Sequence, residues 1–394
     1  MDFKINFSGT GHKYTKEEVD VVVKAMNDAD PLTQGRYRDE FETAFCRYNG
    51  NRFAFSLCNA TAALEITAQL CLFKKDDEII APSHTFTSSV YPFVKNGAKV
   101  VWADIDLNTR VITLENIKKC VTKNTKAIVV VHLYGFIIPE ISQIADFAKQ
   151  NNILLIEDVA QAMGTQMNKK KAGNFGDFAI FSFHSHKNIT TLGEGGILAV
   201  NDKKYADIIP MLRHNGHCSF DYERAVYWKP AMGNVDMAML DGENLMPNNY
   251  CLGEVECALG TKLIERLDEM NEFKRKRAIK FIDELSNFKD IVFHRIDDDR
   301  HNYHLLVAYI KAAKRDELMK KLVYEKAIKC VVQYCPLNRY PLYQKLGFGK
   351  ANCPNSDEFF DNMISFPFQY WMSDEDFTYM LKATKEAASE VGLN

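Results

Sequence analysis

Short apolar runs separated by helical patterns fill residues 53–200. The runs are rich in Val, Ile and Phe and are apolar on both faces; they cover 53–57, 79–82, 99–103, 127–131, 153–157, 178–182 and 196–200. Strands of this kind belong to a sheet that is covered on both sides. We therefore predict an α/β region built on a mainly parallel, seven-stranded sheet.

A helical pattern with charged flanks at 261–285 separates two parts of the chain. Its apolar stripe consists of Leu263, Ile264, Leu267 and Met270. Acidic and basic residues surround this stripe, which is typical of a helix with one buried face. We interpret it as the connecting helix between a large domain at 1–260 and a small domain at 261–394.

The C-terminal part predicts a smaller α+β domain. Apolar runs at 303–310 and 328–333 indicate two strands. A closing helix is predicted at 374–391, because Ser373 is a suitable N-cap and acidic residues follow in the first turn.

Composition and charge narrow the class of protein. The 394 residues are 46% hydrophobic and 26% charged, which is ordinary for a globular protein of two domains. A net charge of −3 with mixed signs gives no basic face for nucleic acid, and no apolar run is long enough to cross a membrane. The N-terminus lacks the features of a secretory signal, so we expect a cytoplasmic protein.

The ten cysteines suggest reduced, mostly buried thiols rather than a disulfide framework. A metal site built from His217, Cys218, Cys251 and Cys257 is the alternative. No CxxC pair supports it, so no metal is expected.

Small residues follow the first strand, at 59–64, where they open a helix. Backbone N–H groups at such a helix start and the Thr61 hydroxyl can approach a phosphate closely. An ordinary strand-to-helix turn explains the same residues.

Asp158 follows the fifth apolar run. A carboxylate at the mouth of an apolar strand is costly unless it meets a positive partner. A protonated ring nitrogen of a cofactor is such a partner, and a helix N-cap is the alternative role.

A lysine amid hydroxyls, imidazoles and glycines follows the sixth run. The stretch 182–196 places Lys187 between two histidine positions and three glycines, where a backbone can approach a ligand closely. Partial burial lowers the pKa of a lysine amine enough for it to form a Schiff base. A solvated loop lysine is the alternative.

Together these motifs resemble the DegT/DnrJ/EryC1/StrS family of sugar aminotransferases, which depend on pyridoxal 5'-phosphate (PLP) and have the aspartate aminotransferase fold. In that family Gly-x-Phe-Gly-Asp, Ser-Phe-x-x-x-Lys-Asn and Gly-Glu-Gly-Gly surround the lysine that forms the Schiff base. They stand here at 173–177, 182–188 and 193–196, and the resemblance extends over nearly the whole chain. It implies that Lys187 carries PLP.

The resemblance also implies a phosphate site and a dimer. The family's Ser-Gly-Thr-Ala-Ala-Leu corresponds to 59–64 here, which places Ala60, Thr61 and Ser182 around the cofactor phosphate. Asn249 corresponds to an asparagine that reaches the phosphate of the neighbouring subunit. A homodimer with shared active sites is therefore expected.

Three more residues correspond to family positions around the cofactor ring. Phe86 matches the aromatic residue that stacks on the ring, Asp158 the partner of the ring nitrogen, and Gln161 a residue near the ring oxygen. With Lys187, Asp158 is expected to be catalytic.

The chain departs from the family pattern at a few positions. Ala60 stands where the family has Gly, Phe136 where it has Gln, and Cys251 where it has Arg. The departures at Phe136 and Cys251 bear on which substrate is bound and not on whether the cofactor is bound.

The reaction implied is transfer of an amino group from an amino acid, with glutamate as the usual donor, to a keto or aldehydo sugar of cell-surface polysaccharide or lipopolysaccharide. The acceptor is either a nucleotide-linked keto sugar or an oxidised 3-deoxy-octulosonate that becomes an 8-amino sugar. One alternative is a PLP-dependent sugar dehydratase, in which histidine replaces the lysine; another is a non-catalytic regulator of the same fold. Retention of Lys187, Asp158 and Ser182 favours the aminotransferase.

Several side chains are candidates for contact with the acceptor, although structural roles explain them equally well. They are His184, His186, Arg213, His214 and Arg339. An unusual segment at 227–230, Tyr-Trp-Lys-Pro, also makes an atypical acceptor plausible.

Overall fold

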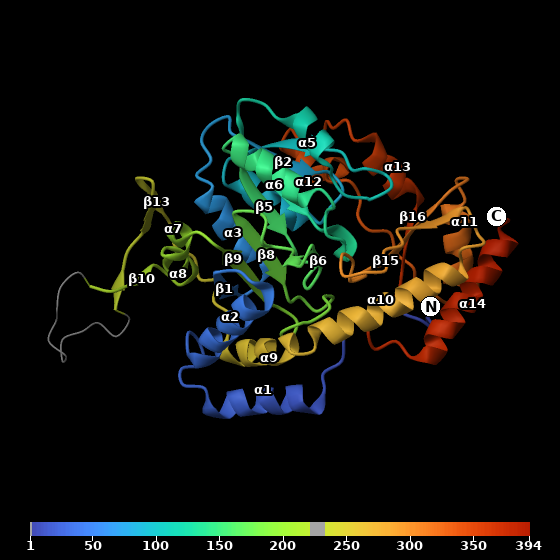
Figure 1. Ribbon diagram of the computed structural model, residues 1–394, viewed down its shortest axis with the longest axis horizontal. Helices are drawn as coiled ribbons and strands as arrows, with labels where there is room; N and C mark the ends of the chain where they lie inside the picture. Colours follow the sequence, from blue (N-terminus) through green and yellow to red (C-terminus); the bar gives the residue numbers. More distant parts are fainter. Residues whose placement is uncertain (1, 221–232) are drawn as a thin grey trace.

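The computed structural model describes residues 2–220 and 233–394. A seven-stranded sheet lies at its centre, with the strand order β1-β9-β8-β5-β4-β2-β3 (Figure 1). Neighbouring strands are parallel except at β9, which is antiparallel to both β1 and β8. The strands are β1 (Phe53–Leu57), β2 (Glu78–Pro82), β3 (Lys99–Ala103), β4 (Thr125–Val131), β5 (Leu154–Asp158), β8 (Phe178–Ser182) and β9 (Gly196–Val200). The predicted sheet is confirmed.

Helices cover this sheet, which explains why its strands are apolar on both faces. α3 (Ala60–Leu70) packs against β8 and β9, α6 (Ile141–Gln150) against β5, and α2 (Arg36–Asn49) against β1. As a result β8 and β9 are buried along their whole length.

Two further helices stack outside α2. α9 (Glu254–Ile264) packs on α2, and α1 (Lys16–Asp28) packs on α9 as the outermost helix, at the bottom of Figure 1. The buried carboxylate of Glu254 accepts hydrogen bonds from the N–H groups of Gly35 and Tyr37, both at 2.8 Å. Because Gly35 has no capping side chain, α9 supplies the cap for α2.

A second hydrophobic cluster lies in the C-terminal part, around a small antiparallel sheet. Its strands are β14 (Ile291–Phe293), β15 (Leu306–Ile310) and β16 (Met363–Phe366). α14 (Asp374–Glu390) contributes buried residues to the same cluster. The predicted N-cap is confirmed, since the Ser373 side chain accepts a hydrogen bond from the N–H of Asp376.

Two strand predictions in this part need correction. The range 328–333 forms no strand and pairs only through isolated bridges, from Ile328 to Ile5 and from Val331 to Ser365. The range 303–310 is strand only from Leu306. The sheet takes its outer strands instead from β14 and β16, which are too short to show an alternating pattern.

The connecting helix is in fact two helices. α9 ends at Ile264 and α10 (Leu267–Glu284) begins after a break at Arg266. The predicted apolar stripe is buried, but it joins the large cluster, whereas the second cluster begins at Ala278. α10 thus connects both hydrophobic clusters, and the proposed division at residue 260 falls within α9.

The remaining elements are short and join these layers. They are α4 (Tyr91–Lys95), α5 (Leu114–Cys120), α7 (Lys203–Ala206), α8 (Ile209–Arg213), α11 (Arg315–Lys320), α12 (Pro341–Lys345), α13 (Pro354–Asn362), β6 (Gln166–Met167), β7 (Lys170–Lys171), β10 (His217–Cys218), β11 (Asn234–Val235), β12 (Ala238–Leu240) and β13 (Glu243–Leu245). Within residues 2–220 and 233–394, none of the helices combines the length and apolar character that a membrane span requires.

All ten cysteines are free thiols. Four of them are buried and six only half-buried, so the expectation that most are buried is wrong.

The buried carboxylate of Glu157 holds the loop between β7 and β8. Oε1 accepts the N–H groups of Phe175 and Gly176 at 2.6 Å, and Oε2 accepts that of Gly173 at 2.9 Å. The Nδ1 of His132 accepts a backbone N–H, so its Nε2 carries the proton that it donates to Glu157 at 3.0 Å. The Gly-x-Phe-Gly-Asp motif therefore has a structural role here.

Removing this carboxylate should destabilise the protein strongly. Glu157→Ala leaves buried N–H groups without an acceptor, at a cost of about 3–5 kcal/mol in the free energy of unfolding. The urea midpoint of unfolding, followed by circular dichroism, should fall accordingly. Glu115→Ala is the control, because Glu115 is exposed and pairs only with Lys119; equal midpoints for the two variants would contradict the prediction.

Candidate active site

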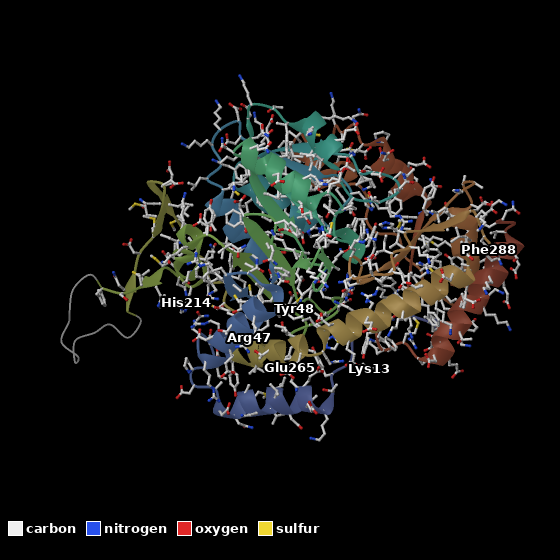
Figure 2. The ribbon with its side chains drawn as sticks, in the orientation of Figure 1. Lys13, Arg47, Tyr48, His214, Glu265 and Phe288 are labelled. Atoms are coloured by element: carbon white, nitrogen blue, oxygen red, sulfur yellow. The ribbon has the colours of Figure 1, made fainter. Side chains whose placement is uncertain are left out.

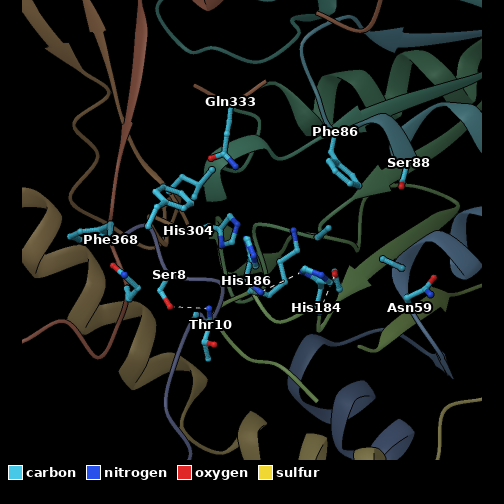
Figure 3. A pocket seen from close by; sticks show the side chains of 18 of the residues that line it. Ser8, Thr10, Asn59, Phe86, Ser88, His184, His186, His304, Gln333 and Phe368 are labelled. Carbon is cyan, nitrogen blue, oxygen red and sulfur yellow. Dashed lines mark hydrogen bonds between the residues drawn. The ribbon is translucent and has the colours of Figure 1, made fainter. Parts of the chain in front are cut away.

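A cavity of about 460 Å³ opens at the carboxyl ends of the strands. Residues that follow β1, β2, β5 and β8 line it, together with the N-terminal segment at 7–11, α10 and the residues after β16. Figure 3 shows Phe86 and Asn59 on one side of the cavity, Phe368 and Ser8 on the other, and histidines between them. Ligands in sheets of this type bind at this edge.

One end of the cavity suits a phosphate. α3 begins at Ala60, and its N-cap Asn59 accepts the N–H of Ala62 at 2.9 Å, which leaves the first N–H groups of the helix free. Thr61 donates to the Ser88 hydroxyl at 3.1 Å. Ser182, at the end of β8, lines the same cavity.

Glycine is required where β9 passes this turn. A Cβ on Gly196 would lie 2.4 Å from the carbonyl carbon of Asn59 and 2.5 Å from the nitrogen of Ala60. The last glycine of the Gly-Glu-Gly-Gly motif thus permits β9 to support the phosphate end from behind.

Asp158 is a buried carboxylate whose bonded partners are neutral. Its Oδ2 accepts the hydroxyl of Ser89 at 2.7 Å and its Oδ1 accepts the N–H of Ala160 at 3.0 Å. Among the described residues it has no ion pair, although it is only 5% exposed. The residues that follow form a turn and not an α-helix, so the N-cap alternative fails. A cation in the cavity would compensate this charge.

Lys187 lines the cavity from the loop after β8. Burial lowers the pKa of its amine from 10.5 to about 8, and the charge of nearby Asp158 opposes this shift. The solvated-loop alternative therefore fails. A backbone hydrogen bond from Lys187 to the carbonyl of His184 at 2.8 Å fixes the loop.

Phe86 and Tyr334 form the upper rim of the cavity. Their ring centroids are 6.0 Å apart, and Phe86 is 51% exposed, so a planar ring has access to its face. Gln161 is buried behind them and donates to the Tyr334 hydroxyl at 3.1 Å. Its own contact with the cavity is thus indirect.

Asn249, His214 and Arg213 lie away from this cavity in the same chain. Asn249 is exposed and forms an isolated bridge with His214, which lies toward the left of the molecule in Figure 2. Arg213 is buried, pairs with Glu42 at 2.5 Å and donates to the carbonyl of Ser56. Its role within the chain is structural.

Two of the three departures from the family pattern, Phe136 and Cys251, lie outside the cavity, whereas Ala60 lines it. Phe136 is 2% exposed and its ring packs edge-on against His294 with centroids 4.2 Å apart. Cys251 is half-buried with its Sγ 3.7 Å from the Arg213 carbonyl. Arg339 pairs with two aspartates outside the cavity. The segment 227–230 lies outside the described residues.

Of the proposed acceptor contacts, His184 and His186 do line the cavity, with ring centroids 5.2 Å apart. Sequence reasoning missed other lining residues, including Tyr334, His304 and Lys274. Tyr334 directly follows the predicted strand at 328–333, and Lys274 lies in a run of basic residues that indicates a solvated helix face.

The comparisons with known proteins agree with this arrangement. Residues 13–385 match the DegT/DnrJ/EryC1/StrS aminotransferase family. GDP-perosamine synthase of Vibrio cholerae is 30% identical over 338 residues, which cover 85% of this chain and 86% of that protein. UDP-4-amino-4,6-dideoxy-N-acetyl-beta-L-altrosamine transaminase of Campylobacter jejuni is 32% identical over 371 residues, with 92% of each chain covered.

Solved structures share the fold. Helicobacter pylori PseC, an aminotransferase of pseudoaminic acid biosynthesis, superposes with a TM-score of 0.87 at 23% identity, covering 99% of this chain and all of that one. The sugar aminotransferase Spr1654 of Streptococcus pneumoniae, described as putative and solved in its PLP form, gives 0.83 at 23% identity, covering 98% and 99%.

Covalent attachment of PLP to cofactor-free protein should follow the titration of Lys187. Only the neutral amine attacks a carbonyl, so with a pKa of about 8 the attachment rate should rise about tenfold per pH unit below pH 8 and level off above it. Stopped-flow absorbance measures this rate. Because Asp158 raises the pKa of Lys187, Asp158→Asn should move the midpoint of this pH profile to lower pH. A midpoint near 10.5 in the wild type would contradict the lowering of the Lys187 pKa by burial.

Proposed function

The chain belongs to the DegT/DnrJ/EryC1/StrS aminotransferase family, and on that premise we propose that it transfers an amino group from glutamate to a keto sugar carried on a nucleotide. It is a PLP-dependent sugar aminotransferase. The nucleotide-linked acceptor is supported by the GDP and UDP sugars in the names of the two relatives above. An oxidised 3-deoxy-octulosonate is the other acceptor to be tested.

The observation that carries the proposal is the proximity of Lys187 and Asp158. Lys187 lines the cavity with a pKa lowered to about 8, and Asp158 is a buried carboxylate close enough for its charge to act on Lys187, with neutral hydrogen-bond partners among the described residues. An aldehyde and a protonated ring nitrogen match these two groups. When bound, PLP supplies an electron-accepting ring that stabilises negative charge on the substrate carbon.

The other predicted residues can hold the rest of the cofactor. We assign the phosphate to the start of α3, with Ala60 and Thr61, and to the Ser182 hydroxyl. Phe86 offers an exposed ring face for stacking. Gln161 holds the hydroxyl of Tyr334, a residue that lines the cavity.

Lys187 and Asp158 then divide the chemical work. Asp158 keeps the ring nitrogen protonated through its buried negative charge. Lys187, once its amine is free, takes the proton from the donor α-carbon and later returns a proton to the acceptor carbon. One amine serves both directions, because the two half reactions are the reverse of each other.

A homodimer with shared sites completes the proposal. Asn249 is exposed and does not line the cavity of its own chain, which supports a phosphate contact in the site of a second copy.

The acceptor can be identified by separating the half reactions. Protein with PLP is mixed with glutamate, and release of 2-oxoglutarate with loss of the PLP absorbance is recorded. Nucleotide-linked keto sugars, the same sugars without the nucleotide, and an oxidised octulosonate are then added. We expect only the nucleotide-linked sugars to restore the PLP absorbance. If the octulosonate alone restores it, the octulosonate and not a nucleotide-linked sugar is the acceptor. A Lys187→Ala protein that still releases 2-oxoglutarate would refute the mechanism.

Subunit sharing can be tested by complementation. Lys187→Ala and Asn249→Ala inactivate different halves of a shared site, so each variant alone should have low activity at limiting PLP. Mixed dimers contain one intact site, and random reassortment should restore about a quarter of wild-type activity. If Asn249 acts within its own chain, mixing restores nothing.

A further inference from the structure

A second lysine, Lys274 of α10, lines the same cavity. It is 4% exposed, and its Nζ donates to Oδ1 of Asn188 at 3.0 Å and to the backbone carbonyl of His304 at 3.1 Å. The face of the Phe368 ring lies 5.6 Å away. Each of these contacts is with a neutral group.

Lys274 therefore has no counter-charge of its own. Within residues 2–220 and 233–394 no carboxylate pairs with it, and burial alone lowers the pKa of its amine to about 7. An ammonium group has three N–H donors, and the two hydrogen bonds use two of them. One donor remains for a group in the cavity.

The other lining side chains leave few candidates for binding an anion. Among the described residues that line the cavity there is no arginine, and Lys187 is committed to the cofactor. Burial lowers the pKa of His186, and burial with the charges of Lys187 and Lys274 keeps the pKa of His304 well below its usual value. The carboxylate of Glu194 carries a negative charge and would repel an anion. His184 also lines the cavity, but its Nε2 lies 3.9 Å from the Glu194 carboxylate, so Lys274 is the cationic side chain that is left for an anion.

A purely structural role accounts for only part of this arrangement. Lys274 does anchor Asn188, whose Nδ2 in turn donates to Asn271 at 2.8 Å. A neutral amide or hydroxyl would provide that anchor without the cost of a buried ammonium group. The choice of lysine at this cavity wall is explained if an anion arrives during the reaction.

We propose that Lys274 binds a carboxylate of the amino-acid donor. The carboxylate then supplies the negative charge that no neighbouring side chain among the described residues provides. The inference rests on the proposed function, because the donor enters the cavity beside Lys187. A carboxylate on the acceptor sugar has the same chemistry, and the experiment separates these two sources.

Carboxylate binding should draw a proton onto Lys274. Above pH 7 the free amine is mainly neutral, and an adjacent anion raises its pKa, so binding is accompanied by proton uptake. The other titratable groups in this part of the cavity are His184, His186, His304, Lys187 and Glu194. Their share of the proton uptake is the uptake that persists when Lys274 is replaced.

The test uses the PLP-loaded protein and glutarate, a dicarboxylate without an amino group. Isothermal titration at pH 8 in buffers of different ionisation enthalpy gives both the affinity and the number of protons bound. We expect uptake approaching one proton in the wild type, and in Lys274→Met a loss of affinity of about tenfold or more together with loss of the uptake. Unchanged affinity and uptake in Lys274→Met would overturn the proposal.

Two further variants separate binding from folding. Lys274→Arg keeps the charge and should retain glutarate affinity within a few-fold. Lys276→Met is the matched control on the same helix, since Lys276 is exposed and pairs with Glu272; it should behave as the wild type. If Lys274→Met fails to fold, Lys274→Gln provides the neutral donor to Asn188, and wild-type glutarate affinity in that variant overturns the proposal.

The source of the carboxylate is resolved by kinetics. If Lys274→Met raises the KM for glutamate and leaves the affinity for the acceptor unchanged, Lys274 binds the donor. The reverse pattern, seen with a carboxylated acceptor sugar, overturns the donor assignment. If no sugar accepts the amino group, the proposed function is wrong, but glutarate binding at Lys274 is unaffected. Failure of the proposed function is therefore distinguishable from failure of the carboxylate site.

Discussion

The end of β5 carries two adjacent buried carboxylates, and the active site depends on their facing opposite ways. Side chains alternate along a strand, so Glu157 and Asp158 point to opposite faces of the sheet. Glu157 is fully bonded by backbone N–H groups and His132. Asp158 has only neutral partners and is left for a cation. A register slip of one residue would exchange these environments and destroy both the loop and the site.

The N-terminal segment joins the catalytic loop to the C-terminal part of the chain. The N–H of Gly11 donates to the carbonyl of Ser185, and a Cβ at Gly11 would lie 2.0 Å from the carbonyl oxygen of Lys187. On its other side, the carbonyl of Gly11 accepts from Tyr370 and that of Thr10 from the Trp371 ring. The cavity wall thus depends on contacts between residues that are far apart in the sequence.

The sequence alone predicted the parts of the structure that local patterns encode. The strands of the large sheet are apolar on both faces because both faces are covered. Since most of these strands are parallel, the residues that follow them lie at the same edge of the sheet. Lys187 and Asp158 were found in this way. The strands β14 and β16 are too short to show a period. In 328–333, Ile328 and Cys330 are buried in the second cluster, while the backbone pairs through isolated bridges and not in a sheet. Tyr334 and Lys274 could not be found, because only the packing of distant elements brings them to the cavity.

Lys187 and Lys274 show how one physical effect serves two purposes. Burial lowers the pKa of both amines, to about 8 at Lys187 and to about 7 at Lys274, so both lose their proton at a much lower pH than an exposed lysine does. At Lys187 the consequence is a nucleophile, because a neutral amine can attack a carbonyl. At Lys274, whose amine is already held by Asn188 and a carbonyl, the consequence is a site that becomes fully charged when an anion binds. A cavity built in this way avoids burying permanent positive charge, and it couples binding of an acidic substrate to uptake of a proton.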